Sequence, residues 1–341
     1  MDKIAKLPAD KRLQIFQNTS VKKKIPVAMV EKDFWICWVM YKLFSDKELS
    51  GILCFKGGTS LSKAYNLIER FSEDLDIILA KEKVLGENED LFKPSIKKQR
   101  KFAEDISVRT AKYVSTALKD KIAAKLGDTV QVYTDEEYVK LNPKYESKEI
   151  DNSSLHIVYP NESTDEYLRP DILLEIGIMS AWIPNEPREI FSYVAEIYPQ
   201  LEIAPAVVPT VKAQRTFWDK ATILHREFYR PENTHTPARY SRHYYDLYQM
   251  SRSPIKDIAL SEYDLLADVV ARKDRLYHCP WARYDLAKPG TLRLLPNDNN
   301  RDIMKKDYHA MQGMIFGDIP NWETILSGLQ ELEDAVNVAR T

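Results

Sequence analysis

The apolar positions of this chain follow two periods, and each period predicts a different kind of element. Short apolar runs between polar or turn-forming residues predict strands at 53–56, 75–79, 129–134, 155–159 and 171–176. Longer apolar runs, or apolar residues that recur every three or four positions, predict helices at 7–19, 27–40, 61–69 and 94–126. Strands and helices that alternate with short links indicate an α/β (α+β) domain with a mixed sheet.

The second half of the chain has a different pattern. Five prolines punctuate the stretch from Pro184 to Pro209, which we interpret as the transition between domains. Helical patterns follow at 211–229, 239–251, 255–277, 300–314 and 322–340. We therefore expect a core domain over residues 1–205 and a helical C-terminal domain over 206–341. The polar stretch 135–154 is expected to be a loop between two strands.

Composition narrows the class of protein. The chain has 341 residues, of which 44% are hydrophobic, so a sizeable core can form. Its 49 basic and 51 acidic residues leave a net charge of −2, so a polyanion would have to meet a local basic patch. Cys37, Cys54 and Cys279 are far apart among apolar or aromatic residues, which favours reduced thiols. No leader and no apolar run of about 18 residues is present, so we expect a cytoplasmic protein without a membrane span.

The first candidate site combines a glycine turn with a pair of acids. Gly57 and Gly58 open onto two hydroxyl residues, Thr59 and Ser60, and this turn can bring backbone N–H groups close to phosphates. Asp74 and Asp76 follow on one side of a short strand, where two carboxylates can hold Mg²⁺ against a triphosphate. The same residues also fit a plain helix-entry turn capped by Ser60, followed by acids that keep a strand edge soluble.

A second acidic strand could complete this site. Asp171, Leu173 and Glu175 share one face of the strand at 171–176. A further carboxylate from a neighbouring strand could bind metal or activate an attacking hydroxyl. The alternative is a partly exposed strand with polar ends.

Two helices of the second half carry candidate charges. Lys220, in the helix 211–229, could reach a triphosphate as a point charge, although a solvated lysine is the ordinary alternative. Arg239, Arg242 and Asp246 fall along one face of the next helix. Asp246 could orient Lys220 or Arg242, or accept a bond from a ribose or base. It could also form an internal salt bridge between helices, and both roles are compatible.

Taken together, these segments resemble the nucleotidyl transferase AbiEii/AbiGii toxin family, which occurs in type IV toxin–antitoxin and phage-defence operons. The resemblance runs from about Met29 to Tyr248. The matching segments are 31–35 (EKDFW), 56–64 (KGGTSLSKA), 70–76 (RFSEDLD), 174–177 (LEIG), 215–221 (RTFWDKA) and 239–247 (RYSRHYYDL).

The resemblance implies a core like that of DNA polymerase β-type nucleotidyltransferases, followed by a helical domain that contributes Lys220 and Asp246 to the site. It implies a nucleoside triphosphate as substrate and Mg²⁺, or Mn²⁺, as cofactor. Ser72, Asp74 and Asp76 match the family's catalytic motif, and Glu175 matches its third acid, with Asp171 as an extra acid that could act instead. The nucleotide-binding residues would be Lys56, Gly57, Gly58, Thr59, Ser60, Lys63, Lys220 and Arg242.

The resemblance also implies the reaction and its partners. We expect transfer of a nucleoside monophosphate to an acceptor hydroxyl, most simply the 3′ end of tRNA, with a cognate antitoxin encoded nearby and no role for DNA. Protein nucleotidylation, or a nucleotide-binding module without catalysis, are the alternatives. A candidate RNA surface is the helix from Lys93 to Lys125, although acids interrupt it. Its basic residues are Lys93, Lys97, Lys98, Arg100, Lys101, Arg109, Lys112, Lys119, Lys121 and Lys125.

Overall fold

The computed structural model describes residues 1–86, 89–143, 145, 150–163, 168–232 and 234–338. Contacts within the chain divide it into two compact units. The first comprises Met1–Ala64, Ser72–Leu91 and Lys101–Val211, and the second Tyr65–Phe71, Phe92–Arg100 and Lys212–Thr341. Each unit draws on separate stretches of sequence, and each is described by itself.

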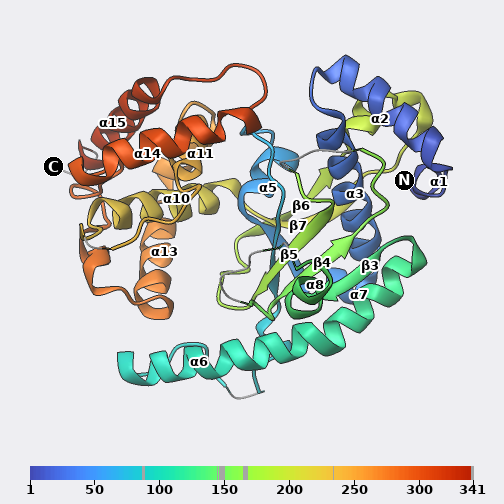
Figure 1. Ribbon diagram of the computed structural model, residues 1–341. Coiled ribbons are helices and arrows are strands. Elements are labelled where there is room, and N and C mark those ends of the chain that lie inside the picture. Colours follow the sequence, from blue (N-terminus) through green and yellow to red (C-terminus); the bar gives the residue numbers. More distant parts are fainter. Residues whose placement is uncertain (87–88, 144, 146–149, 164–167, 233, 339–341) are drawn as a thin grey trace. The chain divides into compact units, whose positions relative to one another are not determined.

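A seven-stranded mixed sheet forms the centre of the first unit (Figure 1). Its order is β3-β4-β5-β2-β1-β7-β6; β5 runs parallel to β2 and β1 parallel to β7, while the other neighbours are antiparallel. The strands are β1 (Leu53–Lys56), β2 (Leu75–Leu79), β3 (Gln131–Thr134), β4 (Ser154–Val158), β5 (Asp171–Gly177), β6 (Asn185–Ile190) and β7 (Ala206–Val211). The expected α/β class with a mixed sheet is confirmed.

One face of this sheet is apolar because alternate residues of the central strands are large and aliphatic or aromatic. Phe55 of β1, Ile77 of β2 and Ile176 of β5 lie in one row across it. Helix α3 packs against this sheet, contacting β5 and β7, and contributes Phe34, Trp35 and Trp38, all buried. The other face carries the polar side chains of the same strands, and it is the face of the candidate site.

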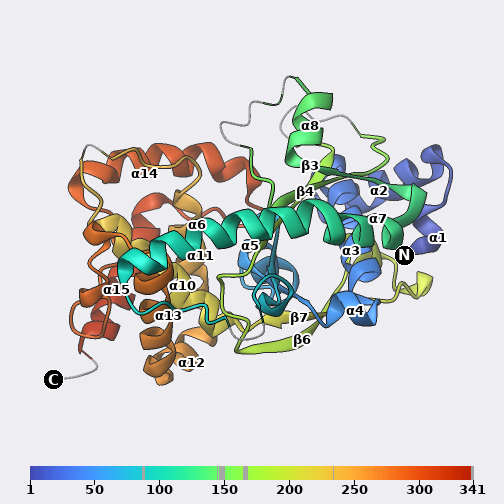
Figure 2. The ribbon, with the colours of Figure 1, turned by 90° about the horizontal axis from the view of Figure 1, so that it is seen from below.

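The helices of the first unit begin and end close to the expected positions, with informative exceptions. They are α1 (Asp2–Ala5), α2 (Ala9–Lys23), α3 (Val27–Phe44), α4 (Lys47–Ser50), α5 (Gly57–Lys63), α7 (Lys119–Leu126), α8 (Asp135–Leu141) and α9 (Tyr193–Ile197), together with α6 (Ile96–Tyr113), whose first turn groups with the second unit. A π-helical turn joins α6 to α7, so the expected long helix is confirmed (Figure 2). Among the described residues, no helix is both long and apolar enough to cross a bilayer.

Three local expectations are wrong. The helix expected at 61–69 instead starts at Gly57 and ends at Lys63, because the glycines themselves enter the first turn. The stretch 135–154 is not a plain loop: Thr134 and Glu137 form a capping box that starts α8. The stretch from Pro184 to Pro209, interpreted as the transition between domains, was assigned no strand, yet residues 185–211 supply β6 and β7.

The second unit is built mainly of helices, as expected. They are α10 (Ala213–Phe228), α11 (Ser241–Ser251), α12 (Ile255–Ser261), α13 (Tyr263–Leu276), α14 (Asp298–Met311) and α15 (Trp322–Val338). The single helix expected at 255–277 is two, because Glu262 leaves the helical conformation between them. Helix α11 packs against α10, α14 and α15, and Trp322 lies between the rings of Tyr244 and Tyr308.

Candidate active site

Three strand ends of the first unit meet at one edge of the sheet. Strand β1 runs antiparallel to β2, so the end of β1 lies beside the beginning of β2, and β5 runs parallel to β2 on its other side, with Leu75 paired to Leu174. The glycine turn follows β1, Asp74 immediately precedes β2, and Arg169 precedes β5 by two residues. Topology therefore brings the turn and the acidic pair together, as the sequence predicted.

Gly57 lies directly against the carboxylate of Asp76. Its φ is +80°, a conformation that favours glycine, and a side-chain carbon at this position would lie 2.0 Å from Oδ2 of Asp76. Lys56 and Asp76 are cross-strand partners, and Nζ of Lys56 is 3.3 Å from Oδ1 of Asp76. Only a residue without a side chain lets the turn approach this acid so closely.

The two hydroxyl side chains of the turn serve its own structure. Thr59 Oγ1 donates to the carbonyl oxygen of Asp74 at 2.5 Å, and Ser60 Oγ donates to the carbonyl oxygen of Gly57 at 2.8 Å. Both side chains are buried. The bond from Thr59 ties the turn to the residue before β2, so the turn and the acidic strand are held together. Any contact of the turn with phosphate would come from backbone N–H groups.

The acidic side chains of β2 and β5 share one face. Asp76 and Glu175 are direct partners in the parallel pairing of the two strands, and Asp74 is two residues before Asp76. The side chain of Asp76 is 29% exposed, Glu175 is exposed, and Asp74 is half-buried. Ser72, which begins this segment of the first unit, is also half-buried.

These carboxylates suit a hard divalent cation whose coordination shell is completed by oxygen atoms of the substrate. Within the described ranges, no three His, Cys, Asp or Glu side chains gather closely enough to hold an ion alone. Mg²⁺ in nucleotide sites usually takes only one or two protein carboxylates and fills its shell with water and phosphate oxygens. The opposed Asp76 and Glu175, accessible and limited to oxygen donors, fit that requirement.

Asp171 does not belong to this set, although the sequence made it a candidate ligand. Its side chain is fully buried, Oδ2 lies 2.7 Å from Nδ1 of His156, and Oδ1 accepts from the hydroxyl of Tyr138 at 3.2 Å. The other ring nitrogen of His156 lies 2.9 Å from Oδ1 of Asp135. Burial by itself would raise the pKa of Asp171, but the bond to His156 and the charge of Arg169 hold it below its ordinary value. The carboxylate is committed to this internal network, so we leave it out of the metal site.

Lys63 is likewise committed elsewhere, although the sequence placed it among the nucleotide-binding residues. Its ammonium group is 2.7 Å from Oδ1 of Asp33 and lies 4.1 Å from the centre of the Tyr193 ring. Both charged side chains are more than nine-tenths buried. Burial alone would lower the pKa of Lys63, but the carboxylate of Asp33 raises it above its ordinary value. This lysine is a structural partner of α3 and we leave it out of the phosphate site.

Glu31, Lys32 and Asp33 belong to the matching segment 31–35, and the sequence alone gave them no role. All three are buried in α3. Glu31 accepts from the backbone N–H groups of Glu162 and Ser163, at 2.8 and 2.9 Å. Three consecutive charges in an otherwise apolar helix were the available signal, because buried charges need partners.

Lys32 and Asp33 reach two further segments. Lys32 Nζ donates to Glu73 Oε2 and to the carbonyl oxygen of Arg169, both at 3.2 Å. Asp33 pairs with Lys63 and accepts from the backbone N–H of Tyr193 at 2.7 Å. The helix thereby fixes the residue next to Asp74 and the last turn of α5.

In the second unit, Asp246 is buried between two cations. Nε and Nη2 of Arg70 donate to its two oxygens at 2.6 and 2.8 Å, and Nζ of Lys220 is 2.6 Å from Oδ2. Burial would by itself raise the pKa of Asp246, but the charges of Arg70 and Lys220 hold it well below its ordinary value. The internal salt bridge is therefore present, and Arg70 is a member of it that the sequence did not single out.

The lysine of this cluster has its own constraints. Burial lowers the pKa of Lys220, and the carboxylate of Asp246 opposes that effect. Nδ1 of His243 lies 3.4 Å from its ammonium group, and the pKa of His243 is well below its ordinary value because of burial and the charges of Lys220 and Arg242. A neutral His243 can accept a bond from Lys220. Arg242 is half-buried next to this histidine.

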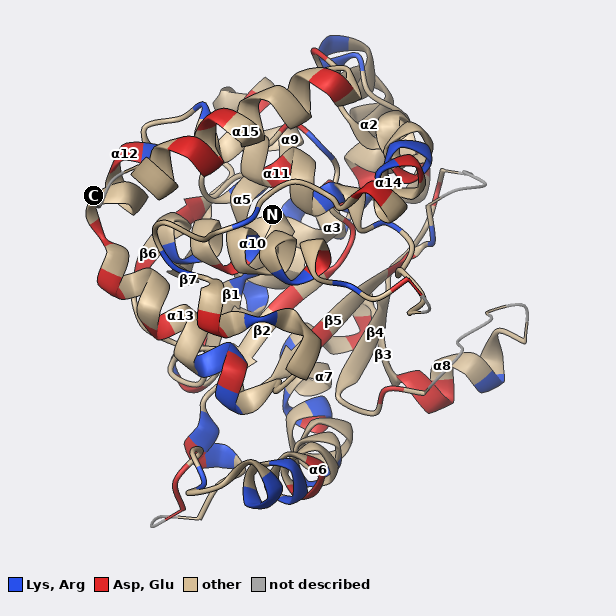
Figure 3. Ribbon diagram, turned by 90° about the vertical axis from the view of Figure 1, so that its left-hand side faces the viewer, with Lys and Arg blue, Asp and Glu red and all other residues tan. Residues whose placement is uncertain are grey.

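The basic helix expected to contact RNA is partly neutralised. Lys119 pairs with Glu137, Lys121 with Glu48, and Lys125 with Asp46 at 3.4 Å. Arg109 pairs with Glu89 and Asp105. Along α6 the basic residues outnumber the acidic ones, Glu104 and Asp105 (Figure 3). The cations nearer its start, including Lys97, Lys98 and Lys101, are exposed.

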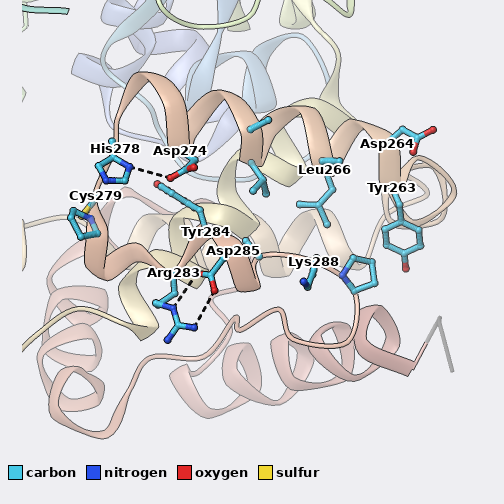
Figure 4. A pocket seen from close by; sticks show the side chains of 16 residues that line it. Tyr263, Asp264, Leu266, Asp274, His278, Cys279, Arg283, Tyr284, Asp285 and Lys288 are labelled. Atoms are coloured by element: carbon cyan, nitrogen blue, oxygen red, sulfur yellow. Dashed lines mark hydrogen bonds and ion pairs between the residues drawn. The ribbon is translucent and has the colours of Figure 1, made fainter. Parts of the chain in front are cut away.

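The second unit also contains a cavity of about 540 Å³ between α13 and the segment that follows it (Figure 4). Its wall mixes apolar side chains such as Leu266 with two ion pairs, His278 with Asp274 at 3.2 Å and Arg283 with Asp285 at 3.0 Å. None of the predicted site residues lines it, so it adds nothing to the nucleotide site.

Comparison with known proteins identifies one family. The model of the nucleotidyl transferase AbiEii toxin, type IV toxin–antitoxin system, matches residues 38–328. No curated protein matches. Among solved structures, MenT4, a nucleotidyltransferase toxin from Mycobacterium tuberculosis, is 15% identical with a TM-score of 0.43, and the match covers 96% of this chain and 99% of that one. JHP933 from Helicobacter pylori is 14% identical with a TM-score of 0.40, and the match covers 90% and 93%.

Proposed function

This chain belongs to the nucleotidyl transferase AbiEii toxin family of type IV toxin–antitoxin systems, and we propose that it moves a nucleoside monophosphate from a triphosphate to the 3′ hydroxyl of a tRNA, releasing pyrophosphate. It is a toxin-type nucleotidyltransferase, and its family implies a nucleoside triphosphate substrate and an antitoxin. One observation supports the chemistry above all: Gly57 and the carboxylate of Asp76 lie in direct contact at the sheet edge where Asp74 lies.

The proposed reaction is an in-line displacement. The acceptor oxygen forms a bond to the α-phosphorus, the bond from that phosphorus to the bridging oxygen breaks, and pyrophosphate leaves with the electron pair. The proton of the acceptor hydroxyl passes to a carboxylate of the site, and the candidate is Glu175, which is exposed and is the partner of Asp76. Backbone N–H groups of Gly57–Ser60 would bind phosphate oxygens, and Lys56 adds a positive charge beside Asp76.

Asp74, Asp76 and Glu175 remain the candidate ligands, and one or two of them would hold a divalent cation whose shell is completed by phosphate and water oxygens. When bound, Mg²⁺ supplies charge neutralisation at the reacting phosphate oxygens. The side chains themselves set where this charge lies, since Asp76 is fixed by its contacts with Gly57 and Lys56, and the chain at Asp74 is fixed by Thr59.

The family resemblance assigns roles to Ser72, Lys220, Arg242 and Asp246 that we retain as proposals. Asp246 is buried and would act by orienting Lys220, not by touching the nucleotide. Lys220 would then offer its charge to the departing pyrophosphate. The proposal of tRNA as the acceptor rests on the family resemblance, with the exposed lysines of α6 as its candidate contacts.

A label-transfer assay tests the proposal. The wild type and Asp74→Ala are incubated with each α-labelled NTP, Mg²⁺, and separate pools of total RNA and total protein. We expect label on RNA of tRNA size with the wild type and none with the variant. Label on protein alone would replace tRNA by a protein acceptor, and NTP binding without any transfer would reject catalysis. Equal labelling by both proteins would reject the role of Asp74.

A further inference from the structure

An arginine that the proposed reaction does not use lies at the same sheet edge as the acidic pair. Arg169 precedes β5, the parallel neighbour of β2, and β5 begins at Asp171, three residues before Leu174, which is the partner of Leu75. Lys32 joins the two beginnings, because its buried ammonium group donates both to Glu73 and to the carbonyl oxygen of Arg169. Hydrogen bonds from a single atom, Nζ of Lys32, therefore connect the segment that carries Asp74 to the segment that carries Arg169.

The guanidinium group of Arg169 is positioned by an aromatic ring and by a loose ion pair with a buried carboxylate. Its Cζ lies 4.9 Å from the centre of the Tyr145 ring, and its Nε is 3.8 Å from Oδ1 of Asp171, too far for a hydrogen bond. Asp171 is fixed in turn by His156 and Tyr138. The side chain of Arg169 keeps 33% of its surface exposed. The buried network around Asp171 thus supports a cation that stays partly exposed to solvent.

The carboxylates of this edge act on Arg169 electrostatically. Burial by itself would lower the pKa of its guanidinium, while Asp171, Tyr145 and Asp74 raise it, and the net effect is a raised pKa. Asp74 is thus near enough for its charge to reach Arg169. A fixed cation at this point offsets the repulsion that Asp74 and Asp76 would otherwise exert on a polyphosphate.

We infer that Arg169 binds a phosphate group of a substrate during nucleotidyl transfer, an inference that rests on the proposed function. A planar guanidinium held against an aromatic ring offers paired N–H donors that match two phosphate oxygens, and its orientation is fixed in advance. The phosphate has two possible sources: the triphosphate of the nucleotide, or the backbone of the acceptor nucleic acid. Tyr145 and Asp171 are positioning residues for this arginine.

Two substitutions and one control test the inference. Arg169→Gln removes the charge, and Arg169→Lys keeps the charge but loses the paired donors. Lys42→Gln is the control, because Lys42 is also a cation over an aromatic ring, 5.6 Å from the centre of Trp38, with a carboxylate oxygen of Asp2 at 3.5 Å. The measurements are the dissociation constant of radiolabelled NTP by equilibrium dialysis without acceptor, the KM for acceptor RNA, and the thermal unfolding midpoint.

The outcomes separate the phosphate sources. Arg169→Gln is expected to raise either the dissociation constant for NTP or the KM for RNA about tenfold or more. Arg169→Lys should give an intermediate value, and Lys42→Gln should leave both constants unchanged. A weaker NTP constant assigns the triphosphate, and a higher KM for RNA alone assigns the acceptor phosphate. Unchanged constants in Arg169→Gln overturn the inference. A wild type that binds NTP without transferring it rejects the proposed function, while the NTP measurement still decides whether Arg169 binds the triphosphate.

Discussion

Asp76 and Glu175 are direct partners on two parallel strands, and Lys56 is the partner of Asp76 on its other side. The row of partners across the sheet therefore consists of one cation, Lys56, followed by two carboxylates, Asp76 and Glu175. Like charges placed opposite one another on neighbouring strands are destabilising. Lys56 offsets the negative charge of Asp76 from one side. On the other side, the repulsion between Asp76 and Glu175 favours the binding of a second cation.

We predict that Mg²⁺ with a bound NTP raises the thermal unfolding midpoint of the wild type, and that Glu175→Gln reduces this increase. Calorimetry with and without Mg²⁺ measures both effects. An equal Mg²⁺-dependent increase in the variant would remove Glu175 from the metal site.

Gly57→Ala should abolish nucleotidyl transfer. The added carbon would collide with Oδ2 of Asp76 and would hold alanine at a φ of +80°, which costs on the order of 1 to 3 kcal/mol of stability. Transfer of label and the free energy of unfolding are the measurements. Gly177→Ala is the control, since nothing lies within 4 Å of its added carbon and it belongs to the same sheet. Full activity in Gly57→Ala would show that the close approach to Asp76 is not required.

Asp246→Asn should destabilise the protein by about 3 to 5 kcal/mol, because Arg70 and Lys220 would keep their charges with the carboxylate gone. Urea unfolding measures this loss. Asp285→Asn is the control: its ion pair with Arg283 is exposed and screened by solvent, so its loss should change stability little. Similar losses in the two variants would contradict the central position of Asp246 in the second unit.

The stability of the protein should fall as the pH rises from about 4.5 to about 7, through Glu31. Burial, together with the side chain of Glu162, raises the pKa of Glu31 from 4.5 to about 7. The folded state therefore binds the proton more tightly than the unfolded state. The resulting stabilisation is complete below pH 4.5 and is lost as the pH passes about 7.

Urea unfolding of Glu31→Gln across this range is the test, since glutamine has no proton to lose. The variant should show a shallower fall in unfolding free energy than the wild type. Glu136→Gln is the control, because Glu136 is exposed and pairs with Lys140 on the surface of α8. A slope in Glu31→Gln equal to that of the wild type would rule out Glu31 as the titrating group.

The parts of the fold that follow from local pattern were predictable. Strands β1, β2 and β5 are short apolar runs between polar residues, and α3 is too long and too apolar to be a strand. The meeting of the glycine turn with Asp76 also followed, because one helix separates two strands that must pair. In contrast, β6 and β7 were missed, since their prolines suggested a transition between domains and only the neighbouring β1 shows that the segment completes a sheet.

The roles of individual charges depended on distant partners. Asp171 and Glu175 lie on one strand face and look equivalent in sequence, but a histidine from β4 and a tyrosine from α8 bury the first and leave the second exposed. Lys63 follows the glycine turn, as a phosphate-binding lysine would, yet α3 provides the carboxylate that binds it. No spacing rule reveals which of two similar acids or bases will be covered by another element of the fold.

Arg70 and Ser72 are separated by a single residue, and they belong to different units. Arg70 is bound to Asp246, and the backbone on either side of it pairs with Met314 and Phe316. Dissection of this enzyme is constrained accordingly. A fragment that ends near Val211 would leave an arginine without its counter-ion four residues before Asp74, so a split or minimal version of the toxin has to retain the C-terminal helices.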